Sequence, residues 1–117
     1  MINKEFIVQL SPELFKAKIE IEKELQIGNK TNEKLYSLIL KAIQFLKEKR
    51  KGSPVPKRLP IYEYYEKKYG ITNLFIIDLS RGSRGFYTMV SGGEFKVLQI
   101  ILEVEETHKG YEKKGHY

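Results

Sequence analysis

The strongest constraint on the fold is a change of hydrophobic period near the middle of the chain. Between residues 11 and 47, apolar side chains recur every three or four residues, which is the spacing of one face of a helix. Between residues 73 and 104, apolar and β-branched residues instead gather in short runs separated by turn-forming segments. Because 117 residues suffice for one core and not for two, the whole chain, 1–117, is predicted to be a single domain.

Two helices are predicted in the first half of the chain. Ser11 and Pro12 form a start signal for the first helix, and Gly28 provides its stop. The second helix is predicted to begin near Asn32, with Gly52 as a candidate end. The turn between them is short, so an antiparallel helical hairpin is expected. Its buried stripes are predicted to be Leu14, Ala17, Ile21 and Leu25 in the first helix, and Leu35, Leu38, Ile39, Ala42, Phe45 and Leu46 in the second.

Strands are predicted on both sides of this hairpin. The run "EFIVQL" (5–10) precedes it, and three β-runs (73–79, 85–92 and 95–104) follow, joined by the hairpin turns "SRGSR" and "GGE". The predicted fold class is α+β, with the element order β-α-α-β-β-β. The helical hairpin is expected to pack on a small, mostly antiparallel sheet that ends in a short basic tail.

The segment between the helices and the meander is harder to assign. Its first part, "SPVPKRLP" (53–60), contains three prolines and is predicted to be an extended connector. Its second part, "IYEYYEKKYG" (61–70), fits a strand, a helical turn, or one followed by the other. The tyrosines there either line a groove or pack with their hydroxyls at its rim.

The positive charge of the chain limits the kinds of partner that it could bind. The formal net charge is +6, and six basic residues against one acid lie in "KEKRKGSPVPKR" (47–58), with more in the tail "HKGYEKKGHY" (108–117). Nucleic acid, an anionic membrane surface or an acidic protein would suit this charge, and a merely solubilising surface is the alternative. With no cysteine, disulfides, thiolate metal sites and cysteine nucleophiles are excluded. With no long apolar run and no signal peptide, the protein is expected to be cytoplasmic.

Two arginines at a predicted turn are candidates for binding phosphate. Arg81 and Arg84 flank Gly82 and Ser83, and the arginine side chain offers a planar fork of donors that fits phosphate oxygens. Because side chains alternate along a strand, Arg84 and Tyr87 are expected on opposite faces of a regular strand. The alternative for Arg84 is a surface ion pair with Asp78 or a nearby glutamate.

The two histidines, His108 and His116, are the natural candidates for acid–base chemistry because imidazole titrates near neutral pH. Both lie within ten residues of the end of the sequence, where solvated, idle side chains are the alternative. Motifs for zinc proteases, P-loop nucleotide hydrolysis and serine triads are missing from the sequence.

Three stretches of the sequence are similar to those of the RelE/ParE superfamily of toxins from toxin–antitoxin systems, in particular its archaeal RelE-like members. They are "VPKRLP", "YGITNLFIIDLSRGSRGFYTMV" and "ILEVEETHKGYEK", which include a Y-x-I-x-N-L entry, an arginine followed three residues later by a tyrosine, and a closing H-K-x-Y-E. The resemblance covers essentially the whole chain. It implies the element order already predicted from the periodicity.

The resemblance implies a ribosome-dependent mRNA endoribonuclease that needs no metal or other cofactor. In such toxins the 2′-hydroxyl of the mRNA attacks the neighbouring phosphate in the ribosomal A site, which leaves a cyclic phosphate and a free 5′-hydroxyl. That chemistry needs a base, an acid and cations for the charge that develops on the phosphate. An aromatic side chain can hold the splayed base by stacking.

The resemblance also assigns roles to individual residues. Arg84 matches the family arginine that contacts the phosphate, with Arg81 as a second choice, and His108 is the first choice for acid–base work. Tyr87 and Tyr111 are the candidates for the tyrosine that stacks on a base or donates a proton. The final His116 and Tyr117 match the His-Tyr ending of the YoeB-type branch, although here an extra "THKGYEKKG" segment precedes them. Candidate RNA-binding residues are Lys57, Arg58, Lys109 and Lys113.

The expected partners are a cognate acidic antitoxin, the ribosome and mRNA, with no membrane. Two alternatives stay open. The first is a ParE-like gyrase inhibitor that shares the fold and lacks nuclease activity. The second is a catalytically inactive, RNA-binding relative, whose affinity would depend steeply on salt.

Overall fold

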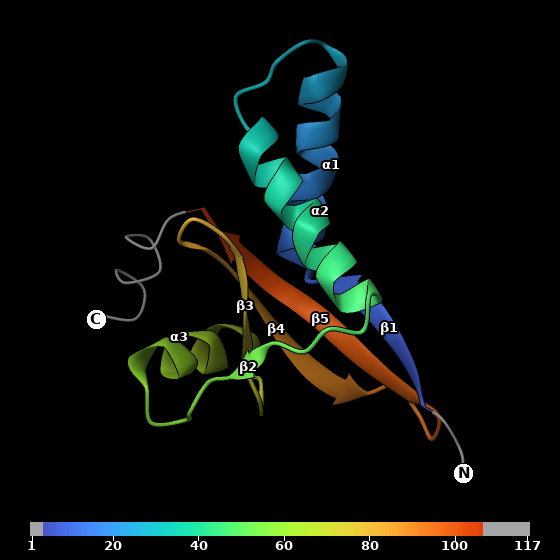
Figure 1. Ribbon diagram of the computed structural model, residues 1–117, viewed down its shortest axis with the longest axis vertical. Coiled ribbons are helices and arrows are strands. Elements are labelled where there is room, and N and C mark those ends of the chain that lie inside the picture. The colour runs from blue at the N-terminus through green and yellow to red at the C-terminus, as the bar shows by residue number, and fades with distance from the viewer. Residues whose placement is uncertain (1–3, 107–117) are drawn as a thin grey trace.

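The computed structural model describes residues 4–106 as a five-stranded sheet with helices on both faces (Figure 1). The elements are β1 (Glu5–Leu10), α1 (Pro12–Gln26), α2 (Glu33–Lys47), β2 (Ser53–Pro54), α3 (Pro60–Tyr69), β3 (Phe75–Ser80), β4 (Ser83–Ser91) and β5 (Lys96–Glu105). The sheet order is β1-β5-β4-β3-β2, in which β1 and β5 run parallel and all other neighbours antiparallel. The predicted α+β class is confirmed, with α3 and β2 as elements that the predicted order lacked.

Ser11 fixes where α1 begins and how it meets the sheet. Its hydroxyl oxygen accepts a hydrogen bond from the Leu14 N–H at 3.2 Å, and Pro12 occupies the first turn, as both residues predict. The same hydroxyl donates to the Leu102 carbonyl of β5 at 2.8 Å and is buried. One side chain therefore caps the helix and attaches it to the neighbouring strand.

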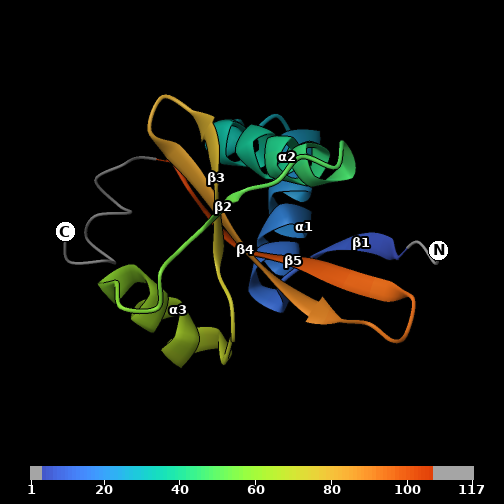
Figure 2. The ribbon, with the colours of Figure 1, turned by 60° about the horizontal axis from the view of Figure 1, so that its bottom comes forward.

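The helical hairpin covers one face of the sheet. α1 and α2 run antiparallel and pack over β5, β3 and β4 (Figures 1 and 2). α2 ends at Lys47, five residues before Gly52, the predicted candidate end. Most residues of the predicted stripes lie in the core of this layer, whereas Ala17, Leu25 and Leu35 are only partly buried. The buried side chains of this core are Leu14, Ile21, Leu38, Ile39, Ala42, Phe45, Leu46, Ile77, Tyr87, Ile101 and Val104.

The tyrosine-rich segment forms α3, which lies on the opposite face of the sheet (Figure 2). Pro60 is its first residue, and Gly70 ends it with a left-handed backbone, φ 67°. Its inward side chains join a second core formed by Ile61, Tyr62, Tyr65, Ile71, Leu74, Phe86 and Leu102. The central strands are therefore covered on both faces, and β4 is mostly buried along its length.

None of the helices between residues 4 and 106 is both long enough and apolar enough to cross a membrane.

Candidate functional site

The β3–β4 turn carries the two candidate arginines at one end of the sheet. The turn has two residues, Arg81 and Gly82, with φ values of 33° and 85°, and Ser80 pairs with Ser83 across it. Positive φ at both central residues is what a type I′ hairpin turn requires, and glycine, asparagine or aspartate usually supplies it. Arg81 therefore adopts a backbone conformation that is unfavourable for an arginine, and its side chain is exposed.

Arg84 forms an ion pair at the start of β4. Its Nε donates to Asp78 Oδ1 at 2.9 Å, and its Nη1 donates to the Ser83 carbonyl at 3.2 Å. In the register of the sheet, Arg84 also lies opposite Glu105 of β5. The Arg84 side chain is 25% exposed and that of Asp78 is 83% exposed, so solvent weakens their attraction. The ion pair foreseen as the alternative role of Arg84 is thus present.

The last described residue lies beside this turn. The Ser83 hydroxyl is buried and donates to the Glu106 carbonyl at 2.7 Å, which attaches the end of the described chain to the start of β4. The remaining candidates lie outside the described residues: His108, Lys109, Tyr111, Lys113, His116 and Tyr117.

Tyr87 lies apart from Arg84. It belongs to the core beneath the helical hairpin, whereas Phe86, its neighbour along the strand, faces α3, as Arg84 does by strand alternation. The ring of Tyr87 stacks on Phe75 with centroids 5.1 Å apart, and its hydroxyl accepts a hydrogen bond from the Gly52 N–H at 3.0 Å. Burial raises the pKa of this hydroxyl. The predicted separation of Arg84 and Tyr87 onto opposite faces is found, and Tyr87 has no open ring face for an RNA base.

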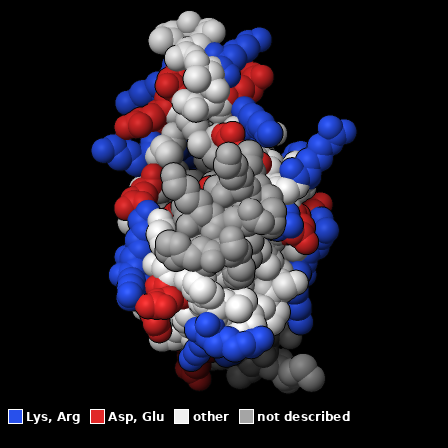
Figure 3. All heavy atoms as spheres, turned by 90° about the vertical axis from the view of Figure 1, so that its left-hand side faces the viewer, with Lys and Arg blue, Asp and Glu red and all other residues white. Residues whose placement is uncertain are grey.

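Lys57 and Arg58 lie in the connector that precedes α3, and both are exposed. In Figure 1 this connector runs at the lower left, whereas the β3–β4 turn is at the upper left. Figure 3 views the molecule from this side, where described Lys and Arg side chains and described Asp and Glu side chains both lie around the margins of the view.

A half-buried carboxylate at the C-terminal end of α3 was not singled out from the sequence. Glu103 accepts hydrogen bonds from Lys68 Nζ and from the Tyr69 hydroxyl, both at 2.8 Å. Lys68 also pairs with Glu13 of α1 at 3.2 Å. The carboxylate of Glu103 raises the pKa of Lys68, and burial followed by the same carboxylate raises the pKa of Tyr69. The cluster joins α3, β5 and α1 through these ion pairs and hydrogen bonds, so we interpret it as structural.

Tyrosine burial in α3 predicts loss of stability at alkaline pH. Burial raises the pKa of Tyr65 far above its ordinary value, so the folded state keeps a proton that the unfolded state loses above about pH 10. The stabilisation is complete below that pH and declines as pH rises, by about 1.4 kcal/mol per pH unit for this one group. Urea unfolding between about pH 9 and pH 11.5 should therefore show a shallower decline in Tyr65→Phe than in the unmodified protein. Equal slopes would contradict this account.

Comparison with protein-family models, with curated proteins and with solved structures finds no match to this chain.

Proposed function

We propose that this protein is a RelE-like toxin of a type II toxin–antitoxin system, which acts in the cytoplasm by cleaving mRNA on the ribosome. The observation that carries the proposal is the placement of Arg84 and Arg81 at one end of the sheet, beside the point from which the histidine-containing tail departs. The element order that the resemblance implies is also present, around the added α3 and β2.

Arg84 has the properties that a phosphate ligand needs. Asp78 and the Ser83 carbonyl hold its guanidinium in one orientation, and exposed ion pairs of this kind stabilise by only about 0–1 kcal/mol. A phosphodiester can therefore replace Asp78 at little cost and use the same planar fork of donors. As the 2′-hydroxyl attacks, negative charge grows on the phosphate oxygens, and a fixed cation there lowers the barrier.

In this proposal, His108 in the segment that follows Glu106 carries out the proton transfers. His108 follows Glu106 by two residues, and two residues of chain span at most about 7 Å. In this proposal the imidazole of His108 takes the proton of the 2′-hydroxyl or gives one to the departing 5′-oxygen. The reaction forms the bond from O2′ to phosphorus and breaks the bond from phosphorus to O5′, so it consumes no co-reactant. The proposed partners are the ribosome, mRNA and an acidic antitoxin.

A second candidate is binding without cleavage, either as a gyrase inhibitor or as an inactive RNA-binding relative. One observation favours it: Tyr87 is buried in the core and stacked on Phe75, so its ring offers no face to an RNA base. In addition, α3 covers the part of the sheet formed by Phe86 and Leu102. A protein of this kind would use its basic residues to bind its target and would not cleave RNA.

Arg84→Ala is expected to reduce ribosome-dependent cleavage about a hundredfold, because a preorganised donor to the developing charge is lost. The measurement is primer extension on a translating mRNA, with ribosome-free RNA in a parallel tube. Lys67→Ala is the matched control, since Lys67 also forms a 2.9 Å ion pair, with Glu63, on an exposed helix face. Cleavage by Arg84→Ala at the control rate would remove Arg84 from the site. If the unmodified protein gives no cuts in either tube, the second candidate replaces the nuclease proposal.

A further inference from the structure

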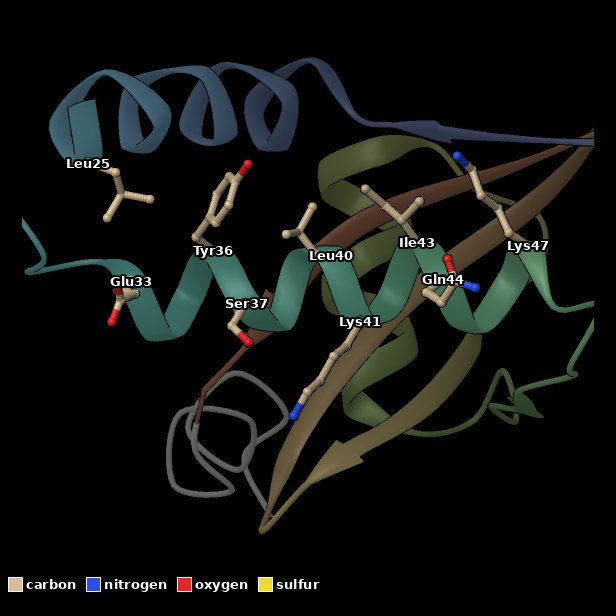
Figure 4. A pocket seen from close by; sticks show the side chains of 9 residues that line it. All are labelled: Leu25, Glu33, Tyr36, Ser37, Leu40, Lys41, Ile43, Gln44 and Lys47. Atoms are coloured by element: carbon tan, nitrogen blue, oxygen red, sulfur yellow. The ribbon is translucent and has the colours of Figure 1, made fainter.

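The outward face of α2 carries an open groove of about 640 Å³ that none of the described candidate residues occupies (Figure 4). It runs along the helix on the side away from the fully buried stripe, and its lining residues Tyr36 and Ile43 also pack against the edge of the core beneath the hairpin. α1 contributes one side chain to its wall. The lining residues are Leu25, Glu33, Tyr36, Ser37, Leu40, Lys41, Ile43, Gln44 and Lys47.

The groove has an apolar centre and opposite charges at its two ends. Leu40 lies at the middle and is 42% exposed, with Tyr36 and Ile43 partly exposed on either side of it. Glu33 is the first residue of α2 and Lys47 is the last. Among the residues that the structure describes, neither Glu33 nor Lys47 takes part in an ion pair. Positions 33, 36, 40, 43 and 47 alternate steps of three and four, which is the seam of a coiled coil.

The lining positions of the groove, though not the stripe of three-and-four steps itself, are nearly symmetric about Leu40, with Ser37 and Ile43 each three residues from it. Glu33 and Lys47 each lie seven residues from Leu40, and Tyr36 and Gln44 each lie four. If a second α2 is laid antiparallel with the two Leu40 side chains in contact, each Glu33 meets the Lys47 of the other helix. A two-fold interface requires one surface to match itself in this way. We propose that a second copy of this chain occupies the groove, through antiparallel pairing of the two α2 helices about Leu40.

The other side chains of the groove permit this pairing. The Tyr36 hydroxyl donates to Glu22 Oε2 of α1 at 2.9 Å, which holds the tyrosine ring against α1 and away from the centre of the groove. Figure 4 shows Lys41 directed away from Leu40, so its ammonium group can extend into solvent beside the axis. Burying Leu40 and the edges of Tyr36 and Ile43 supplies the driving force, and the end charges fix the antiparallel direction.

The pairing is tested by reversing the end charges one at a time. Glu33→Lys places like charges at both ends of the dimer, and Lys47→Glu does the same with the opposite sign. Each variant alone is expected to dimerise at least about tenfold more weakly than the unmodified chain in sedimentation velocity. Mixed together, the two variants are expected to form a heterodimer in which every end pair is again opposite in charge, detectable by native mass spectrometry. The double variant E33K/K47E is expected to dimerise like the unmodified chain.

Leu40→Glu tests the centre of the same surface, and Glu63→Lys on α3 is the control for a charge reversal elsewhere. Leu40 is exposed, so the variant is expected to keep the helical circular dichroism of the unmodified chain while becoming monomeric. Glu63 is also exposed and should leave the dimer unchanged. An unmodified chain that stays monomeric up to about 0.5 mM overturns the proposal. A dimer that survives Leu40→Glu, or two charge variants that fail to pair when mixed, overturns it equally.

Discussion

Phe86→Ala is expected to lower the free energy of unfolding by about 3–5 kcal/mol. Phe86 lies at the centre of the core between the sheet and α3, is fully buried, and packs against the Tyr65 ring with centroids 4.7 Å apart. Its removal leaves a cavity between β4 and α3. The neighbouring side chains could fill this cavity only if α3 moved toward the sheet. The loss should appear as a lower denaturation midpoint in urea with little change in slope.

Phe95→Ala is the matched control for this prediction. It removes the same atoms from a side chain that is 46% exposed, and a change within about 0.5 kcal/mol is expected. Hydrogen exchange adds a local measurement, because Phe86→Ala should speed exchange of the α3 amides more than that of the α2 amides. Equal destabilisation by the two substitutions would mean that α3 contributes no separate core.

The helical hairpin was predictable because its two helices each bury one continuous stripe. The residues expected to face the core in α2 are buried there, with Leu35 partly buried, and β1 has the predicted bounds, Glu5–Leu10. In both cases local period and burial agree, so a window of ten to fifteen residues holds enough information. The parallel pairing of β1 with β5 joins segments about ninety residues apart in the sequence, and local period says nothing about such a contact.

The sequence does not distinguish helix from strand in α3 because its composition and its period disagree. Tyrosine favours strands, yet Ile61, Tyr65 and Tyr69 are four residues apart, which is the spacing of one helix face. Pro60, at the first helical position, was the further signal that a helix begins there. The two-residue strand β2 had no signal at all, since its proline permits an edge position only.

In the candidate site, too, some features could be predicted from the sequence and others could not. The Arg84–Asp78 pair could be foreseen because both residues flank one tight turn, where strand pairing brings them together. The burial of Tyr87 could not be foreseen, since it depends on parts of the chain that are distant in sequence, namely the helical hairpin and Gly52. A tyrosine three residues after an arginine carries no information about which face of a two-sided sheet it occupies.

That contact leads to the second large effect, at Gly52. A Cβ added there would lie 2.6 Å from the Ile76 carbonyl oxygen and 2.8 Å from Tyr87 Cε1, closer than side chains normally approach. The carbonyl belongs to β3 and the ring is stacked on Phe75, so neither can yield without moving β2 off the sheet edge. Gly52→Ala is therefore expected to destabilise the fold by about 3 kcal/mol, through overpacking and through loss of the hydrogen bond to the Tyr87 hydroxyl.

Two variants separate these causes. Tyr87→Phe removes only the hydroxyl that accepts from the Gly52 N–H and is expected to cost about 1 kcal/mol, measured by urea unfolding. Gly85→Ala makes the same chemical change as Gly52→Ala within the sheet, but its nearest neighbours would lie at 3.7 Å, an ordinary contact, so it should cost far less. If Gly52→Ala were no more destabilising than Gly85→Ala, the connector would not be held against β3 and Tyr87 as described.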